Sequence, residues 1–558
     1  GSAGESLAAG AIFTMPVLFM WAAEGKSTMP GLGEIALICI CGGALGVFFM
    51  IPLRSALIVQ EHGVLPYPEG TACAEVLLAG EKGGAKAGTV FAGLGIAAVY
   101  KFIADGLRVF PSEVDFEVKS YKGAGIGMDV LPALLGVGYI CGVRVASYLL
   151  AGGVTAWFVI MPVIALFGED AVLYPATVPI SELGAWGIWS NYIRYIGAGA
   201  VAAGGIFSLI KALPLIIRTF AQAVRGYGKN MEEESRTSQD IPIRVVLVGI
   251  LITAIVMWLI PVIPVNLPGA ILIVVLGFFF ATVSSRMVGL VGSSNNPVSG
   301  MAIATLIITA AIYKSSGATA EGMVSSIAVG TIICIIAAMA GDTSQDLKTG
   351  YIVGATPKKQ QYGELISVVV SSMAIGGILY LLNAAWGYGS SELPAPQATL
   401  MKMVVEGVMG GNLPWNLVFA GVALAVAAEI LTIPVLPFAV GLYLPIHLST
   451  PMAVGGLVRL WIEKKRGEEE ENQKQMIESG ILYSSGLIAG EGLIGILLAV
   501  FAVLPSKRGG TVGEWLAAAG DRMNFGNIGA LIMFVVLIGT LISVSYTHLR
   551  AHETLRHL

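Results

Sequence analysis

The sequence predicts an all-α, polytopic transmembrane helical bundle, and three observations support this prediction. Of the 558 residues, 56% are hydrophobic and 12% are charged, whereas a soluble domain carries about 25% charged residues. Apolar runs of about 17–25 residues, long enough to cross a bilayer, recur along the whole chain. The chain also contains 72 glycines, gathered in motifs such as AGGVTA (151–156), and small residues let membrane helices approach closely. A soluble globular domain is therefore excluded.

The apolar runs predict about thirteen to fifteen membrane segments, some of them broken or re-entrant. Proline and glycine interrupt several runs, and an interrupted helix is tolerated at membrane depth only where protein or water satisfies its backbone. All segments are assigned to a single transmembrane domain, residues 1–544. The expected spans are 6–23, 32–59, 70–79 joined to 85–104, 128–149, 150–167, 187–217, 241–262, 268–291, 298–313, 323–341, 363–383, 413–432, 433–447, 450–462, 478–504 and 526–544.

A short internal repeat supplies two proton-coupling candidates. AGESLAAGAI (3–12) is echoed by AGEGLIGILL (489–498), and transporters are often built from duplicated halves whose equivalent helices meet at the substrate site. Each copy holds one carboxylate, Glu5 or Glu491, in an otherwise apolar segment. A carboxylate at low dielectric takes up a proton more readily than in water. Each is equally compatible with a neutral side chain that bonds a helix carbonyl.

A charged stretch directly follows the apolar run TIICIIAA (331–338). Asp342 and Asp346 are four residues apart, so they share a face if the helix continues, and both are further proton-coupling candidates. We expect this end to face a cavity; the alternative is a solvated helix end. Neighbouring hydroxyl, amide and ammonium groups are candidates for the substrate path: Thr343, Ser344, Gln345 and Lys348.

Two further polar breaks contribute candidates for the substrate path. SSNNPVSG (293–300) interrupts two apolar runs, and the amides of Asn295 and Asn296 offer donors and acceptors that suit a peptide backbone or another zwitterion. Ser299 is a further candidate for the substrate path. The alternative interpretation of 293–300 is an ordinary loop. In VLPYPEG (64–70), Tyr67 and Glu69 lie where a new helix is expected to begin, a place that favours an anionic group.

The end of the chain differs from the rest in composition. Apolar IGALIMFVVLIGTLISV (528–544) gives way abruptly to SYTHLRAHETLRHL (545–558), which we expect to be a non-native tail. His548 and His552 have the i, i+4 spacing of a metal-binding helix face, but no carboxylate supports them. The five cysteines lack the paired spacing of a zinc or disulfide framework. No metal site is predicted.

Loop charges predict an orientation. Residues 218–244, 346–361 and 463–475 are rich in Lys and Arg, whereas 168–187 contains neither. By the positive-inside rule the first three loops are cytoplasmic and the last is external. We expect the chain in the cell (inner) membrane. The net charge of −4 is small and dispersed, so nothing suggests nucleic acid as a partner.

Six stretches, in order, carry a family resemblance. They are SAGESLAAGAIFTMP, IPLRSALIVQEHGVLPYPEGTACAEVL, GLVGSSNNPVSGM, MAGDTSQDLKTGYIVGATPKKQQYGELI, LPFAVGLYLPIHLSTPMAVGGLVR and SGLIAGEGL. Together they resemble the oligopeptide transporter (OPT) family, which includes the yellow-stripe-like carriers of metal chelates, and in particular a bacterial member. The resemblance extends from Gly1 to about Val544. It implies an all-helical secondary carrier that moves peptides, peptide-like compounds or metal chelates inward, usually with protons, and that lacks its N-terminal helices here.

We therefore expect a secondary active transporter that imports oligopeptides or peptide-like compounds by proton symport. A carrier of metal chelates is the alternative, because the sequence does not decide between these substrates. A remote alternative is a prenyl-transferring membrane enzyme, since DTSQD (342–346) resembles half of a two-aspartate magnesium site, but the second motif that would clamp a diphosphate is missing. An ion channel is the other remote alternative. We expect no enzymatic activity and no cofactor; the partners are the substrate, protons and the lipid bilayer, and the proton gradient supplies the energy.

Overall fold

The computed structural model describes residues 2–556 with several gaps, the longest of which is 211–234. The other gaps are 64, 66, 81–84, 118–120, 202, 205–206, 208–209, 292, 294–295, 297, 318–319, 391–392, 394, 411–413, 465–469, 507–509 and 521–522. Among the described residues, eleven helices are long and apolar enough to cross a membrane. The predicted all-α, polytopic membrane protein is thus confirmed.

The chain divides into two compact units, and each unit takes chain from two separate stretches. Unit 1 comprises 1–83 and 205–413, and unit 2 comprises 84–204 and 414–558. The two copies of the AGE sequence lie in different units, the first in unit 1 and the second in unit 2.

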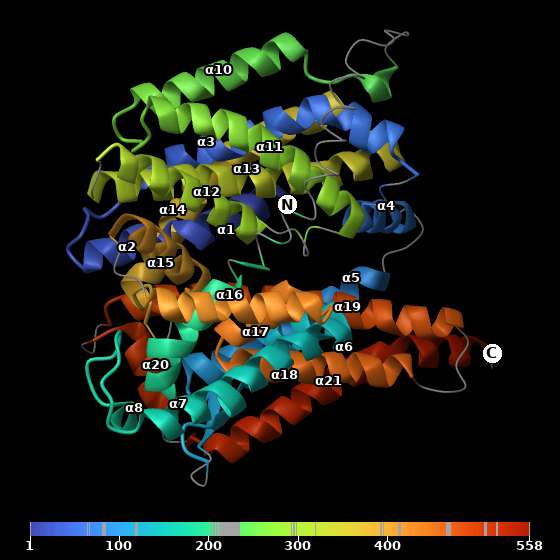
Figure 1. The fold of residues 1–558 in the computed structure, drawn as a ribbon. Coiled ribbons are helices and arrows are strands. Elements are labelled where there is room, and N and C mark those ends of the chain that lie inside the picture. Colours follow the sequence, from blue (N-terminus) through green and yellow to red (C-terminus); the bar gives the residue numbers. More distant parts are fainter. Residues whose placement is uncertain are drawn as a thin grey trace. The chain divides into compact units, whose positions relative to one another are not determined.

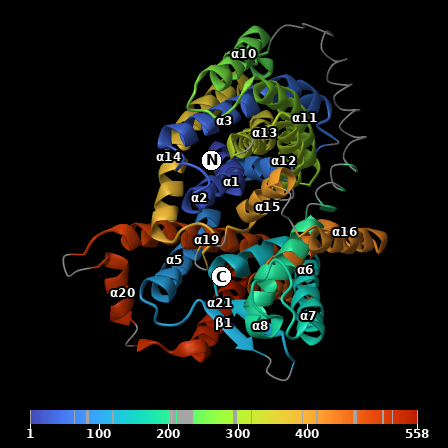
Figure 2. The same ribbon diagram turned by 60° about the vertical axis from the view of Figure 1, so that its left-hand side comes forward.

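Unit 1 is built around one long, buried helix. Its helices are α1 (Ser2–Thr14), α2 (Pro16–Ala23), α3 (Leu32–Arg54, continued by a π-helical turn over Ser55–Gln60), α4 (Pro68–Gly80), α10 (Ile243–Leu259), α11 (Leu267–Val291), α12 (Val298–Ser315), α13 (Ala320–Val353), α14 (Pro357–Ala385) and α15 (Pro396–Gly410). Helix α13 packs against α1, α3, α11 and α12 (Figures 1 and 2). In the most apolar 18-residue stretch of α13, 83% of the residues are buried.

Glycines allow this close packing. A Cβ added at Gly10 of α1 would lie 2.5 Å from the Ile335 side chain of α13, and one at Gly42 of α3 would lie 2.9 Å from the same side chain. Either distance is too short for two carbon atoms. The small residues noted in the sequence therefore act where α1 and α3 touch α13, as expected for helices whose association depends on packing.

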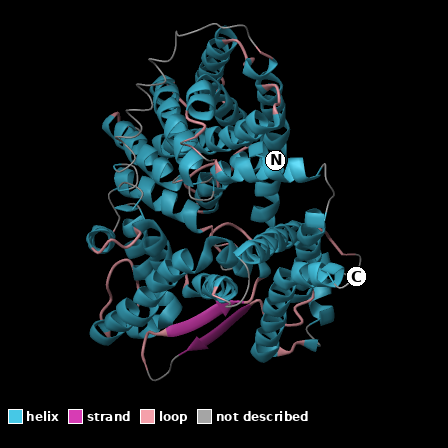
Figure 3. Ribbon diagram, turned by 90° about the vertical axis from the view of Figure 1, so that its right-hand side faces the viewer, coloured by secondary structure: helices cyan, strands magenta, loops and turns pink. Residues whose placement is uncertain are grey.

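Unit 2 contains a second set of helices and one β-hairpin. Its elements are α5 (Ala85–Lys101, continued by a π-helical turn over Phe102–Gly106), β1 (Glu113–Glu117), β2 (Gly125–Asp129), α6 (Pro132–Val154), α7 (Met161–Gly168), α8 (Ile180–Ile188), α16 (Trp415–Ile430), α17 (Val435–Tyr443), α18 (Ile446–Glu463), α19 (Glu470–Val503), α20 (Val512–Gly520) and α21 (Gly526–Arg556). The strands pair antiparallel, with Glu113 opposite Asp129, and Figure 3 shows the hairpin in magenta. The sequence analysis did not anticipate it.

Several predicted boundaries are wrong, because helices are longer than the apolar runs. The expected spans 128–149 and 150–167 form one helix of 37 residues, Pro132–Gly168, which is interrupted where Gly142 has φ 77°. Residues 346–353 of a predicted loop belong to α13, and α8 occupies part of the loop predicted at 168–187. Helix α21 runs into 545–558, and most of the predicted loop 218–244 lies outside the described residues.

Candidate functional site

The polar stretch 342–348 lies inside α13, because the helix continues to Val353. Asp342 and Asp346 are therefore one turn apart on a continuous helix, as their spacing predicts. Thr343 and Ser344 are fully buried, and Lys348 is 1% exposed. Burying polar side chains is unfavourable unless they are hydrogen bonded, so these residues need partners within unit 1. The stretch is not a solvated helix end.

Asp342 is bonded to α1. Its carboxylate Oδ2 accepts a hydrogen bond from the Ser6 hydroxyl, with 2.5 Å between the oxygens. Glu5, the preceding residue, is exposed on α1, and its charge acts on Asp342 together with those of Asp346 and Glu69. Two of the sequence-predicted proton-coupling candidates, Glu5 and Asp342, are thus neighbours. Ser6, which connects them, was missed by the sequence analysis although it directly follows Glu5.

Glu69 and Gln345 form a second connection, between α4 and α13. The Gln345 amide nitrogen donates to Glu69 Oε2, and the Gly70 backbone N–H donates to Gln345 Oε1 at 2.6 Å. The other Glu69 oxygen accepts from the Ser293 backbone N–H at 2.9 Å. The chain can start α4 here because Pro68 suits the first position of a helix. The breaks before α4 and before α12 therefore meet the polar stretch of α13 at the Glu69 carboxylate.

Lys348 satisfies the backbone at the break before α4. Its ammonium donates to the Leu65 carbonyl at 3.0 Å and to the His62 carbonyl at 3.3 Å, and it lies 2.8 Å from His62 Nδ1. The same ammonium lies 5.5 Å from the ring centre of Tyr67. Burial raises the pKa of Tyr67, which keeps its hydroxyl protonated. A cation at low dielectric is stabilised by such carbonyls and by an aromatic face.

Asn296 and Thr343 complete the polar groups of this site. The Asn296 amide donates to the Ser284 hydroxyl at 2.6 Å, and that hydroxyl donates to the Ala337 carbonyl of α13. Asn296 Oδ1 and the Thr343 hydroxyl are buried and have no hydrogen-bond partner among the described residues. Ser299 is half-buried in the first turn of α12, and Asn295 lies outside the described residues.

In unit 2, Glu491 holds the start of a helix. One of its oxygens accepts from the Ala133 backbone N–H of α6 at 2.6 Å, and the other lies 3.5 Å from the Lys101 ammonium. Lys101 also pairs with Asp105 at 2.6 Å. A carboxylate at a helix N-terminus satisfies a free N–H and the helix dipole. Glu491 therefore has a bonded environment unlike that of its sequence echo, Glu5.

Comparison with known proteins identifies the family. The family described as OPT oligopeptide transporter protein matches residues 1–502. A Haemophilus influenzae protein that bears the name of an oligopeptide transporter is 31% identical over 550 residues, which cover 86% of this chain and 85% of the relative. Metal-nicotianamine transporter YSL3 of Arabidopsis thaliana is 25% identical over 526 residues, which cover 83% and 73%. The similarity thus includes residues of both units.

Proposed function

Because this chain belongs to the OPT oligopeptide transporter family, we propose that it imports oligopeptides or peptide-like compounds by proton symport. The family makes it a multi-pass membrane transporter rather than a prenyl-transferring enzyme. The relative from Haemophilus influenzae that is named as an oligopeptide transporter supports a peptide substrate. We place the protein in the cell (inner) membrane, with the turn between α13 and α14 on the cytoplasmic side.

The observation that carries the proposed path is the buried polar face of α13. Lys348 and Gln345 bond to the break before α4, at Leu65 and Gly70, and the Gln345 amide nitrogen also lies 3.5 Å from the Val288 carbonyl in the last turn of α11. Broken helices with free backbone groups at membrane depth are a general feature of substrate sites in transporters. The unpartnered groups of Asn296 and Thr343 are available to a substrate amide, which both donates and accepts hydrogen bonds.

For the proton, we propose Asp342, with Glu5 as its neighbour. Among the described residues, Asp342 accepts a hydrogen bond from the Ser6 hydroxyl and forms no ion pair with a cation. Glu491, in contrast, lies 3.5 Å from the Lys101 ammonium and accepts a hydrogen bond from the Ala133 backbone N–H, so its carboxylate already has structural partners. Asp346 lies one turn further along α13 and is the next candidate.

Metal chelates are the second candidate class of substrate. The observation that favours them is the similarity to two Arabidopsis thaliana proteins named as metal-nicotianamine transporters, YSL3 and YSL2, each 25% identical over more than four-fifths of this chain. Such a complex carries carboxylates as a peptide does. The unpartnered Asn296 Oδ1 and Thr343 hydroxyl are open to either ligand.

Uptake into proteoliposomes tests the proposal. A labelled tetrapeptide is supplied with and without an inward proton gradient, and a labelled ferric or zinc nicotianamine complex is supplied in parallel. We expect the peptide to accumulate above its external concentration only when the proton gradient is present. Gradient-driven accumulation of the chelate alone would move the assignment to the second candidate. Equal peptide uptake with and without the gradient would contradict symport.

A further inference from the structure

We propose that Glu113, Asp115 and His447 of unit 2 bind a divalent first-row transition metal ion. The inference does not rest on the transported substrate, because it concerns a cluster separate from the polar face of α13 and its bonding partners. The three residues come from two distant parts of the chain, β1 and the first turn of α18.

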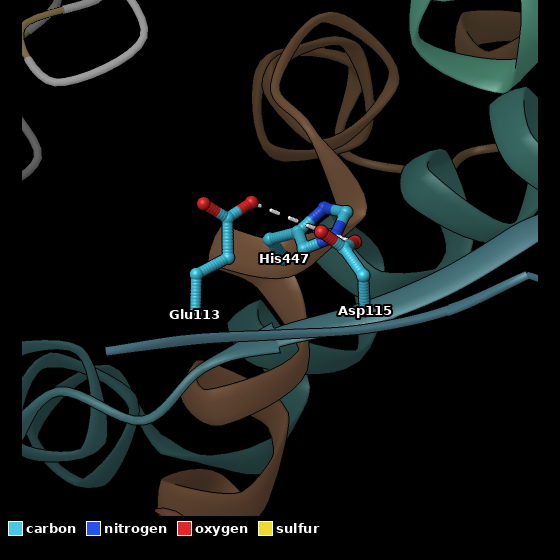
Figure 4. A group of neighbouring side chains, drawn as sticks. All are labelled: Glu113, Asp115 and His447. Carbon is cyan, nitrogen blue, oxygen red and sulfur yellow. Dashed lines mark hydrogen bonds and ion pairs between the residues drawn. The ribbon is translucent and has the colours of Figure 1, made fainter. Parts of the chain in front are cut away.

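The ligand atoms converge. One ring nitrogen of His447 and one carboxylate oxygen each of Glu113 and Asp115 all lie within 4.8 Å of one another. His447 Nε2 contacts Asp115 Oδ1 directly and is 3.8 Å from Glu113 Oε1. Glu113 and Asp115 alternate along β1 and so project from the same face of the strand. Figure 4 shows both carboxylates and the imidazole approaching one another from β1 and α18.

The imidazole is rigidly held. His447 is 2% exposed and stacks on Trp186, with ring centres 4.9 Å apart, while Trp157 meets it edge-on at 5.4 Å. Gly127 of β2 lies against the ring edge that carries Nε2, since a Cβ there would lie 1.7 Å from His447 Nε2. Thr450 of α18 donates to the Gly127 carbonyl at 3.0 Å. A ligand whose position is fixed in advance loses little freedom when it binds a metal.

The carboxylates are accessible. The side chains of Glu113 and Asp115 are 48% and 54% exposed, so an ion can enter from that side and keep water in its remaining positions. Zinc binds imidazole nitrogen and carboxylate oxygen at about 2.0–2.2 Å, which places neighbouring ligand atoms about 3 Å apart. Small rotations of the two exposed side chains bring the observed atoms to that spacing.

The donor set suits a metal ion. Two carboxylates beside one imidazole repel each other unless a cation lies between them, and one imidazole with two carboxylates is a donor set suited to zinc, manganese or iron(II). An imidazole that ligates through Nε2 carries its proton on Nδ1, which in His447 is buried and has no hydrogen-bond partner among the described residues. The proposal therefore rests on the convergence of the three ligand atoms.

The test is direct metal binding to the full chain in detergent, purified without a polyhistidine tag. All variants carry His548→Ala and His552→Ala, so that this i, i+4 pair cannot bind the ion. Zn²⁺ is titrated by calorimetry, and Co²⁺ by its visible d–d absorption. The test variant is Glu113→Gln with Asp115→Asn, whose exposed positions tolerate the change. The matched control is Glu182→Gln, an exposed carboxylate of α8 in the same unit.

We expect one equivalent of metal to bind the background protein and the Glu182→Gln control. In the double variant the affinity should fall by more than about 100-fold, since removal of outer-shell partners alone costs about 10–100-fold. His447→Gln should also abolish the nitrogen-ligated Co²⁺ spectrum; should this buried variant not fold, the double variant still decides. Absence of binding to the background protein, or equal affinity in the double variant, would overturn the proposal.

Discussion

Asp342 of α13 accepts a hydrogen bond of 2.5 Å from Ser6 of α1, although 336 residues separate the two in sequence. The bond ties the N-terminal helix to the central helix of unit 1. It also places a carboxylate that is bonded to a neutral hydroxyl beside the proposed path. The predictions below begin with this carboxylate.

Replacing Asp342 by Asn should abolish the part of uptake that depends on the proton gradient. The amide keeps the size and the bond to Ser6 but cannot take up a proton. We expect a loss of at least about tenfold, because positioned proton-transfer groups contribute about 100-fold or more where they act. Glu321→Gln, which changes an exposed carboxylate of the same helix, is the control. Unchanged uptake by a well-inserted Asp342→Asn protein would refute the role of Asp342.

Gly70→Ala should destabilise unit 1. A Cβ at Gly70 would lie 2.5 Å from the Gln345 carbonyl oxygen and 2.8 Å from its Oε1, so α4 and α13 must separate. Overpacking of this kind costs about 1–3 kcal/mol. At Gly363 of α14 a Cβ meets nothing within 4 Å, and Gly363→Ala should be neutral or slightly stabilising. Thermal unfolding in detergent compares the two, and equal midpoints would contradict the tight α4–α13 contact.

Lys348→Met should loosen the break before α4. The methionine fills a similar volume but leaves the Leu65 and His62 carbonyls without their donor, at a cost of about 1–3 kcal/mol in the free energy of unfolding. Amide hydrogen exchange at 61–71 should rise. Lys359→Met, which changes an exposed lysine at the start of α14, should have no effect. Exchange that is the same in both variants would show that Lys348 does not support this segment.

Acid should remove the stabilisation that Glu24 provides. Burial raises the pKa of Glu24, but hydrogen bonds and charges from Lys26 and Lys402 outweigh it, so that the pKa lies below its ordinary value of 4.5. A lowered pKa contributes stability above the unfolded value, and this contribution is lost as the pH falls through the folded value. Glu24→Gln should therefore melt earlier than the unchanged protein at pH 7 and together with it near pH 3. A difference in melting temperature between the two proteins that is the same at pH 7 and near pH 3 would contradict the ion pairs.

The membrane fold was within reach of the sequence, and so were candidate polar residues of α13 and of the break before α4. Composition gave the polytopic bundle, and polar residues in an apolar setting marked Glu69, Gln345 and Lys348 as a group, because such residues need a buried partner or a function. Their specific pairing was not predictable, since hydrogen bonds between distant helices leave no local pattern. His62 and Ser284 illustrate this, each lying in a segment that was assigned no chemistry.

The cluster in unit 2 was out of reach for a related reason. His447 is 332 residues from Asp115, and the hairpin that carries Asp115 is short and polar within an apolar chain. Strand pairs of this length have little periodic signal. The broken helix at Gly142 was also invisible, because glycine in an apolar run more often marks close packing than a change of direction.

The interleaved division of the chain has a consequence for its biosynthesis. At about 5–20 residues per second, the 336 residues between Ser6 and Asp342 correspond to roughly 17–67 s of translation. During that time α1, α3 and α4 are already in the membrane without the helix that completes their core, while segments of unit 2 are being inserted. The glycine faces of α1 and α3 must stay unassociated, or be shielded by the insertion machinery, until α13 emerges. Errors of assembly are therefore expected to concentrate in this interval.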